Sequence, residues 1–340
     1  MRQIVIAKAG APEVLKLREV ADPEPGPGEV RIRVRASGVN FADIMARLGL
    51  YPDAPPLPCV VGYEVAGVID ALGDGVEGLE VGARVLAMTR FGGYSEAVVV
   101  PAAQALLLPE GLSFEKAAAI PVNYLTAWMM LVRIAGVRPG ERVLVQAVAG
   151  GVGQAALQIC RWRGAEVIGT ASAGKHARLR ELGVSHCIDY RSVDFERAVK
   201  EITGGRGVDI ALDGVGGASL RKSYRCLAPM GRLFAYGASS LAPQTKRKLI
   251  PALRGLLSMP RFGAVELMND NRGVYGVNMG HLWEEVAALT AMTEAILAAV
   301  VAGDLDPVVD RVFAFEEAAA AHAYIQERRN FGKVVLAPAL

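Results

Sequence analysis

The stretch VLVQAVAGGVGQAALQICRWRGAEVIGTAS, residues 143–172, decides the fold of this chain. It contains an apolar run, a glycine cluster, a helical stretch and a second apolar run. The pattern Gly151-x-Gly153-x-x-Ala156 has the spacing of a loop that holds the pyrophosphate of a dinucleotide. Backbone N–H groups and the helix dipole attract anionic phosphate at such a place. We therefore expect a phosphate site, and not only a tight turn, at Gly150, Gly151, Val152 and Gly153.

The residues after this stretch continue the alternation of strands and helices. Strand and crossover helix in repetition is the signature of a doubly wound parallel sheet. Six strands of this kind make one complete dinucleotide-binding Rossmann domain of α/β class. The expected strands are RVLVQAV (142–148), EVIGTA (166–171), HCIDY (186–190), VDIALDG (208–214), GRLFAYG (231–237) and GVYGVN (273–278), with helices at 154–163, 177–182, 195–203 and 219–226 between them.

The N-terminal third has a different texture. Residues 1–100 consist of short β-branched runs separated by Gly and Pro, which predicts an antiparallel, barrel-like β domain. A long helix expected at 282–302 leads to a final strand pattern, NFGKVVL, that returns to this β domain. We therefore predict a substrate domain of residues 1–121 and 280–340 with a dinucleotide-binding domain, residues 122–279, inserted between its two parts.

The end of the second Rossmann strand lacks an expected acid. NAD-binding domains usually place Asp or Glu there, to bind the ribose 2′-hydroxyl. This chain instead has Thr170, Ala171 and Ser172, followed by Lys175, and Tyr190 follows the third strand. Serine and lysine favour a 2′-phosphate by hydrogen bond and charge. The pattern predicts NADPH as the cofactor; the alternative is that Lys175 is a solvated surface lysine.

Composition excludes several other classes of protein. The 340 residues carry 37 basic and 35 acidic side chains, a formal net charge of +2, so we expect no nucleic-acid partner. The longest apolar run, residues 287–302, is too short and alanine-rich to span a bilayer. The N-terminus lacks the apolar core of a signal peptide, and a cytoplasmic location is expected.

At these motifs the sequence resembles the medium-chain dehydrogenase/reductase superfamily, and within it the zinc-free, zeta-crystallin-like quinone oxidoreductases. The similarity extends over nearly the whole chain and is greatest to the subgroup of the vesicle amine transport protein. It implies a GroES-like β-barrel for the substrate domain and a homodimer joined at the sixth strand. The resembling segments are VRASGVNFADIMARLGLYP (34–52), PVNYLTAWMML (121–131), AVAGGVGQAALQIC (147–160), KRKLIPALRGLLSMPRF (246–262) and NFGKVVL (330–336).

The resemblance also implies roles for individual residues. Asn40, Thr126 and Asn330 would lie near the nicotinamide half of the cofactor. Tyr236 and Gly237 would border the nicotinamide riboside. The remaining implied contacts are Gly151, Val152 and Gly153 at the pyrophosphate and Ser172, Lys175 and Tyr190 at the adenosine phosphate.

A metal site is not expected. Zinc alcohol dehydrogenases carry Gly-His-Glu where this chain has Gly62-Tyr63-Glu64, so the histidine ligand is missing. The four cysteines and four histidines show no metal-ligand spacing. No Tyr-x-x-x-Lys and no Gly-x-Ser-x-Gly occurs either, which disfavours a short-chain reductase and a hydrolase.

Without zinc, the cofactor carries the chemistry and the protein positions it. We expect hydride transfer to a small-molecule quinone or another α,β-unsaturated carbonyl, with a polar group near the developing charge on oxygen. The candidates are Asn40, Asp43, Tyr51 and Tyr63. Alternatively, Asp43 caps a short helix and Tyr63 only packs where the histidine would be.

A rival interpretation comes from the basic segment 246–261. Residues 241–265 contain no acid and place leucines at helical spacing, as in a helix that lies on an anionic membrane. The protein would then be a nucleotide-gated lipid- or membrane-surface-binding protein with little reductase activity. We favour a lid or a dimer contact for this segment.

Overall fold

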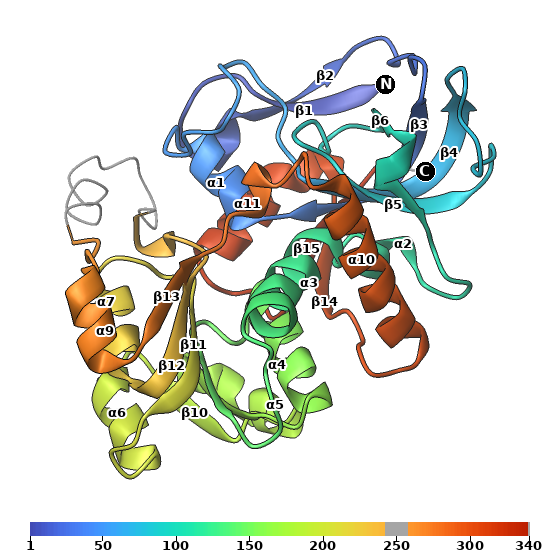
Figure 1. The fold of residues 1–340 in the computed structure, drawn as a ribbon. Coiled ribbons are helices and arrows are strands. Elements are labelled where there is room, and N and C mark those ends of the chain that lie inside the picture. The colour runs from blue at the N-terminus through green and yellow to red at the C-terminus, as the bar shows by residue number, and fades with distance from the viewer. Residues whose placement is uncertain (242–257, 339–340) are drawn as a thin grey trace.

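The computed structural model describes residues 1–241 and 258–338. These residues form two large sheets, one above the other, and a separate two-stranded sheet (Figure 1). The expected segment 246–261 therefore lies largely outside the described residues. Strands of the upper sheet come from both ends of the chain, and those of the lower sheet come from its middle. Along the chain, the expected domain boundaries fall in the segments that connect strands of one sheet to strands of the other. The division into 1–121 with 280–340 and 122–279 stays a proposal.

The upper sheet has seven strands in the order β14-β15-β3-β4-β5-β7, with β6 also paired to β3. Its pairs are antiparallel apart from β14 and β15. Alternate residues of β3 are buried, because successive side chains point to opposite faces. A separate hairpin joins β1 (Arg2–Ile6) to β2 (Leu15–Glu19). The sheet strands are β3 (Glu29–Val39), β4 (Glu64–Leu72), β5 (Arg84–Met88), β6 (Ala97–Pro101), β7 (Ala105–Leu107), β14 (Val309–Ala314) and β15 (Lys333–Ala337).

The lower sheet has six parallel strands in the order β10-β9-β8-β11-β12-β13, which confirms the expected Rossmann-like fold. The strand order reverses between β8 and β11, and ligands of such sheets bind at the carboxyl edge beside that reversal. The strands are β8 (Arg142–Val145), β9 (Glu166–Ala171), β10 (His186–Asp189), β11 (Val208–Asp213), β12 (Leu227–Ala235) and β13 (Gly273–Gly276). The helices between them are α4 (Gly151–Trp162), α5 (His176–Glu181), α6 (Phe195–Ile202), α7 (Ala218–Arg225) and α9 (Ala264–Asp270).

Helices join the two sheets. The helical stretch after Ser113 is broken at Pro121, because proline lacks the N–H that a continuing helix needs. Ser113 caps the first part by accepting the Lys116 N–H. The expected helix 282–302 begins four residues later than predicted. These helices are α1 (Phe41–Arg47), α2 (Phe114–Ala117), α3 (Pro121–Trp128) with a π-helical turn at Met129–Ile134, α10 (Val286–Val301) and α11 (Ala318–Gln326).

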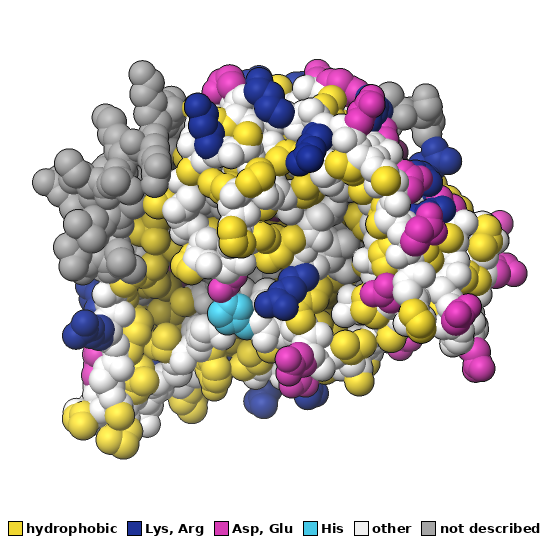
Figure 2. Space-filling view, turned by 90° about the horizontal axis from the view of Figure 1, so that it is seen from above, with side chains coloured by type: hydrophobic (Ala, Val, Ile, Leu, Met, Phe, Trp, Pro, Cys, Tyr) yellow, Lys and Arg dark blue, Asp and Glu magenta, His cyan; other side chains and the backbone are white. Residues whose placement is uncertain are grey.

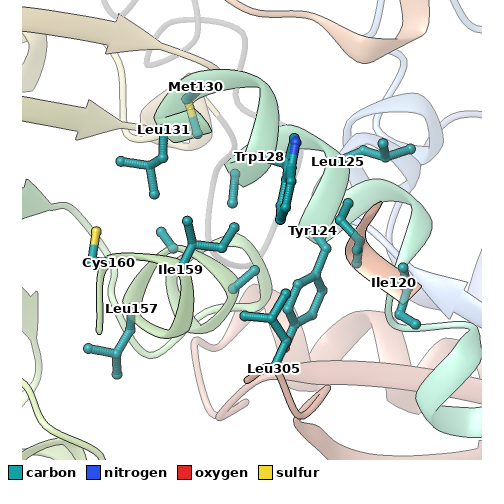
Figure 3. Close-up of a cluster of buried hydrophobic side chains, with 14 of the residues drawn as sticks. Ile120, Tyr124, Leu125, Trp128, Met130, Leu131, Leu157, Ile159, Cys160 and Leu305 are labelled. Carbon is teal, nitrogen blue, oxygen red and sulfur yellow. The ribbon is translucent and has the colours of Figure 1, made fainter. Parts of the chain in front are cut away.

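The largest buried cluster lies where α3 packs against α4 (Figure 3). Trp128 of α3 stacks on Trp162 of α4, with ring centroids 5.5 Å apart. Tyr124 is buried beside them and donates its hydroxyl to the Gln158 side chain, 2.9 Å away. Aromatic side chains of this size bury much apolar area, so this contact holds the glycine loop at the start of α4 in a fixed place.

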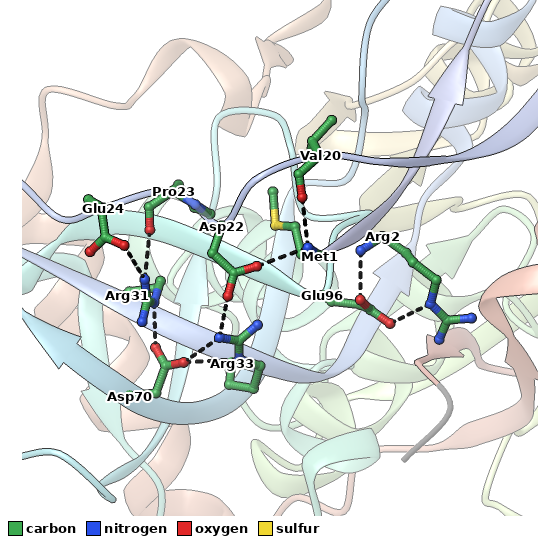
Figure 4. Close-up of polar contacts among 10 residues, drawn as sticks. All are labelled: Met1, Arg2, Val20, Asp22, Pro23, Glu24, Arg31, Arg33, Asp70 and Glu96. Carbon is green, nitrogen blue, oxygen red and sulfur yellow. Dashed lines mark hydrogen bonds and ion pairs between the residues drawn. The ribbon is translucent and has the colours of Figure 1, made fainter.

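Charged side chains fasten the N-terminal hairpin to the upper sheet (Figure 4). Arg33 contacts both Asp22 and Asp70 at 2.7 Å, and the N-terminal amine lies 3.0 Å from Asp22. Hydrogen bonds from Arg33 and from the N-terminus lower the pKa of Asp22 to about 2. All these groups are partly exposed, so solvent screens them and each pair contributes about 1 kcal/mol or less.

Candidate active site

A large cleft, with a volume of about 1880 Å³, runs between the two sheets along the carboxyl ends of the parallel strands. It brings together all of the expected site residues except Asp43. On the face shown in Figure 2, basic and acidic side chains are interspersed among apolar ones. The expected residues that line the cleft are Asn40, Tyr51, Tyr63, Thr126, Gly150, Gly151, Val152, Gly153, Thr170, Ser172, Lys175, Tyr190, Tyr236, Gly237 and Asn330.

The glycine loop lies where α4 begins. No side chain caps this helix at Gly150, so the N–H groups of its first turn have no capping partner within the loop. A Cβ at Gly151 would lie 2.3 Å from the Asn123 side chain, and one at Gly153 would lie 2.5 Å from the Ala147 carbonyl oxygen. Both glycines are therefore required for packing of the loop as well as for access of a phosphate.

The turn before the glycines is held by Thr170. Its hydroxyl donates to Gln146 Oε1 at 2.8 Å and accepts the Ala147 N–H at 3.0 Å. Ala147 itself has φ of +53°, a left-handed conformation that residues with a Cβ rarely adopt. Such backbone strain persists only where surrounding contacts enforce it, so Thr170 shapes the loop from the neighbouring strand.

The far end of the cleft carries the residues expected for a 2′-phosphate. Lys175 Nζ donates to the carbonyl oxygens of Arg328 at 2.9 Å and Asn330 at 2.6 Å. Burial is the main influence on the ammonium and lowers the pKa of Lys175. Lys175 is half-buried at the edge of the cleft, and two of its three N–H groups are already used. One N–H remains for a ligand.

Arg328 is a site residue that the sequence did not identify. It lines the cleft and donates to the Tyr190 hydroxyl at 3.3 Å. Burial acts to raise the pKa of Tyr190, but hydrogen bonds from Arg328 and Arg191 outweigh it and lower that pKa. Arg328 also has a left-handed φ of +59°. The pair of arginines before the final strand was the available signal, but 138 residues separate Arg328 from Tyr190.

The residues expected at the nicotinamide also line the cleft, and one of them, Asn330, contacts Lys175 through its carbonyl oxygen. Tyr236 and Gly237 follow β12, and a Cβ at Gly237 would lie 2.8 Å from the Gly214 carbonyl oxygen. Thr126 donates its hydroxyl to the Val122 carbonyl oxygen, and Asn330 Nδ2 donates to the Gly332 carbonyl oxygen. These bonds fix the two side chains at the cleft surface.

Asp43 does not reach the cleft. It is completely buried, and its carboxylate accepts the N–H groups of Asn40 at 2.8 Å and Gly62 at 3.1 Å and the Tyr94 hydroxyl at 3.0 Å. Burial raises the pKa of Asp43 to about 7. At the third position of α1 the side chain turns back toward the helix start, so Asp43 caps the helix below Asn40 and does not contact a ligand.

Tyr51 and Tyr63 line the part of the cleft within the upper sheet. Their rings meet edge to face with centroids 6.3 Å apart, and Tyr63 also contacts Phe91. Tyr63 is only 7% exposed, and its hydroxyl interacts with that of Tyr51. Burial raises the pKa of both tyrosines, so both hydroxyls stay protonated and able to donate.

The residues around Tyr63 do not fit a zinc ion. Tyr63 stands where zinc alcohol dehydrogenases have a histidine ligand, and tyrosine is not among the Cys, His and carboxylate ligands that zinc usually takes. In the described part of the chain, no group of three His, Cys, Asp or Glu side chains could hold a metal. No helix in that part is long and apolar enough to cross a membrane.

Comparison with known proteins places this architecture in a family. Residues 26–110 match the alcohol dehydrogenase GroES-like domain, and residues 182–336 match the family described as zinc-binding dehydrogenase. The rat synaptic vesicle membrane protein VAT-1 homolog is 44% identical over 99% of this chain and 84% of its own length. A quinone oxidoreductase of Pseudomonas aeruginosa is 38% identical over 99% of both chains.

Solved structures of oxidoreductases are similar to this chain over nearly its whole length. The Escherichia coli quinone oxidoreductase complexed with NADPH is 30% identical, with a TM-score of 0.88 over 99% of this chain and 100% of that one. The CurK enoyl reductase is 29% identical, with a TM-score of 0.86 over 99% of both chains. With the GroES-like sheet, the six-stranded parallel sheet and the cleft between them, this chain belongs to the medium-chain dehydrogenase/reductase superfamily of oxidoreductases, among the VAT-1 homologues and quinone oxidoreductases.

Proposed function

We propose that the protein reduces quinones or other α,β-unsaturated carbonyls with NADPH, by hydride transfer that needs no zinc. One observation carries this proposal: the uncapped start of α4 and the basic residues Lys175 and Arg328 line the same cleft as the apolar pocket at Tyr63. The phosphate groups of a dinucleotide would bind at the start of α4 and at Lys175 and Arg328. A reducible acceptor would bind beside Tyr63.

The chain's own residues would hold the cofactor at three places. The N–H groups at the start of α4 suit the pyrophosphate, since a helix N-terminus favours anions. Lys175, Arg328 and Tyr190 line one part of the cleft and suit a 2′-phosphate, to which each would donate a hydrogen bond. When bound, NADPH supplies a hydride from its nicotinamide ring. The relative whose structure contains NADPH supports this choice of cofactor.

The side chains around Tyr63 favour an apolar acceptor. Phe41, Met45, Met88 and Trp283 also line the cleft. Methionine is flexible and polarisable, so such a wall adapts to flat rings of different size. A quinone or an enone fits these surroundings better than a charged substrate does. The names of the quinone oxidoreductase and enoyl reductase relatives agree with this class.

Tyr63 is the best candidate to stabilise negative charge on the acceptor oxygen. Its hydroxyl is buried and protonated, and it interacts with the hydroxyl of Tyr51. A hydroxyl at the cleft can donate to the carbonyl oxygen of an acceptor and stabilise the negative charge that develops there. Tyr51 stands beside it at the cleft and is a second donor.

The direct test is steady-state oxidation of NADPH, followed by its absorbance, against a panel of quinones, enones and enoyl thioesters. We expect turnover with apolar quinones or enones and none with saturated ketones. Exhaustive chelation should leave both activity and melting temperature unchanged. Stoichiometric zinc, or activity lost on chelation and restored by zinc, would contradict the proposal.

A second function is suggested by the rat relative, whose name describes a vesicle membrane protein. A nucleotide-gated lipid- or membrane-surface-binding protein would use the basic segment 246–261, most of which lies outside the described residues. Flotation with anionic liposomes, compared with the variant Lys246→Glu/Lys248→Glu, tests it. Membrane binding together with no turnover on the full panel would favour this function, and the cytoplasmic location expected from the sequence stays a prediction until then.

We also propose a homodimer. β13 lies at the edge of the six-stranded sheet, where its unpaired backbone groups could pair with a second copy. Light scattering should give twice the chain mass of 35.9 kDa. A monomer at micromolar concentration would contradict this proposal.

A further inference from the structure

Glu64 and Lys333 form an ion pair that is almost completely buried. The side chains of Glu64 in β4 and Lys333 in β15 are 0% and 2% exposed. They come from distant parts of the chain, and Lys333 lies at the wall of the cleft. Gly38 of β3 leaves room for them, since a Cβ there would lie 2.4 Å from Glu64 Oε1 and 2.6 Å from the Lys333 side chain. The neighbouring strand is thus adapted to this pair.

The pair fixes the side-chain amide of Asn40 from both ends. Lys333 Nζ donates to Asn40 Oδ1 at 2.7 Å, and Asn40 Nδ2 donates to Glu64 Oε1 at 2.8 Å. An amide turned by half a revolution would direct its NH₂ at the ammonium and its oxygen at the carboxylate. The two charges therefore permit one orientation, which leaves one N–H of Asn40 free for a ligand in the cleft.

The same carboxylate also holds the helix beside the glycine loop. Glu64 Oε2 accepts the N–H of Val122, in the first turn of α3, at 2.7 Å. The next residue, Asn123, touches the position of Gly151, and Thr126 one turn further lines the cleft. Glu64 thus connects Asn40 in the upper sheet to the helix that packs on the nucleotide loop.

We propose that Glu64 and Lys333 are positioning residues for the reaction: they orient Asn40 and set its distance from the nucleotide loop. This inference rests on the proposed function for its kinetic consequence, but the orientation of Asn40 can be measured separately. A buried ion pair adds little net stability compared with apolar residues of similar volume, so stability alone does not account for it. Removal of one partner, in contrast, leaves an uncompensated buried charge.

The experiment compares Glu64→Gln, Lys333→Met and the double variant. Each single variant should lower the melting temperature, and the double variant should regain most of it, because no lone charge remains buried. In the double variant kcat should stay about 10- to 100-fold low while the Kd for NADPH changes little, since a small misplacement costs that much in rate. A larger isotope effect with deuterated NADPH should accompany the lower kcat. The double variant Arg142→Met/Glu166→Gln removes a partly exposed ion pair of the lower sheet and should leave kcat unchanged.

A second measurement does not depend on turnover. Nitrogen-labelled asparagine, with Asn40→Ala to assign the signal, reports the side-chain amide of Asn40 by NMR. We expect a shifted amide signal, protected from exchange in the wild type, that loses its protection in the double variant. If the double variant keeps this signal, or regains both stability and full kcat, the positioning role is refuted. If the wild type oxidises no NADPH but the Asn40 signal still depends on the pair, the proposed function fails and the positioning of Asn40 stands.

Discussion

The preference for NADPH over NADH should depend on Lys175, and the variant Lys175→Met measures how much. Methionine keeps most of the apolar stem and removes the ammonium. The two bonds from Lys175 to the carbonyl oxygens of Arg328 and Asn330 are lost with either cofactor. Only the contact with a 2′-phosphate is specific for NADPH, so the ratio of the two dissociation constants isolates it.

The magnitude follows from the exposure of the ammonium. A hydrogen bond to a charged group contributes about 1.5–3 kcal/mol when well shielded. Lys175 is half-buried, and two of its N–H groups already bond to carbonyl oxygens. Its contact with the 2′-phosphate should therefore contribute about 1.5 kcal/mol or somewhat less to the binding free energy of NADPH. Because about 1.4 kcal/mol corresponds to a factor of ten, Lys175→Met should lower the NADPH preference about tenfold.

Calorimetric titration of NADPH and NADH, with wild type and with Lys175→Met, gives the four dissociation constants that this comparison needs. The preference should also decrease as ionic strength rises, since the charges lie at the edge of the cleft. Lys200→Met is the matched control, because Lys200 lies on α6 outside the cleft and pairs with Glu196. An unchanged ratio in Lys175→Met, or equal affinities for both cofactors in the wild type, would refute the assignment of this end of the cleft.

Three further predictions concern packing, catalysis and acid stability. Gly153→Ala should destabilise the fold by about 1–3 kcal/mol and weaken NADPH binding, because its Cβ would meet the Ala147 carbonyl oxygen. In the control Gly174→Ala the Cβ meets no atom, so both the thermal melt and the Kd for NADPH should match those of the wild type. Tyr63→Phe should lower kcat about 100-fold at an unchanged Kd for NADPH, and unaltered turnover would exclude Tyr63 as the donor to the substrate oxygen. Burial, aided by the charge of Arg47, lowers the pKa of His322 from 6.5 to about 3. Between pH 6.5 and about pH 3, therefore, His322 binds a proton in the unfolded chain and not in the folded one, so its contribution to stability falls as pH is lowered. The raised pKa of Asp43 acts in the opposite direction over the same range, so the contribution of His322 is read as a difference between two proteins. Urea unfolding at about pH 7 and about pH 5 should show a less favourable change in stability for the wild type than for His322→Gln, and equal changes would contradict the prediction.

The sequence by itself determined the parts of the molecule that depend on local order. The glycine spacing, the alternation of strands and helices, and the return of NFGKVVL to the first sheet follow from short-range patterns, and the structure has each of them. Ser172, Lys175 and Tyr190 were predictable as cleft residues for the same reason. Each follows a parallel strand, and the carboxyl ends of such strands share one edge of the sheet.

Only the tertiary structure decided which distant side chains meet. Arg328 reaches Tyr190 across 138 residues, and Lys333 reaches Glu64 across 269, distances over which no periodicity in the sequence operates. The direction in which the Asp43 side chain points also depends on tertiary contacts. Asp43 and Asn40 lie three residues apart, yet the capping geometry of α1 directs the carboxylate of Asp43 into the interior and leaves Asn40 at the cleft. The capping position was an alternative that the sequence offered, but the contacts with Gly62 and Tyr94 that enclose this carboxylate belong to the assembled fold.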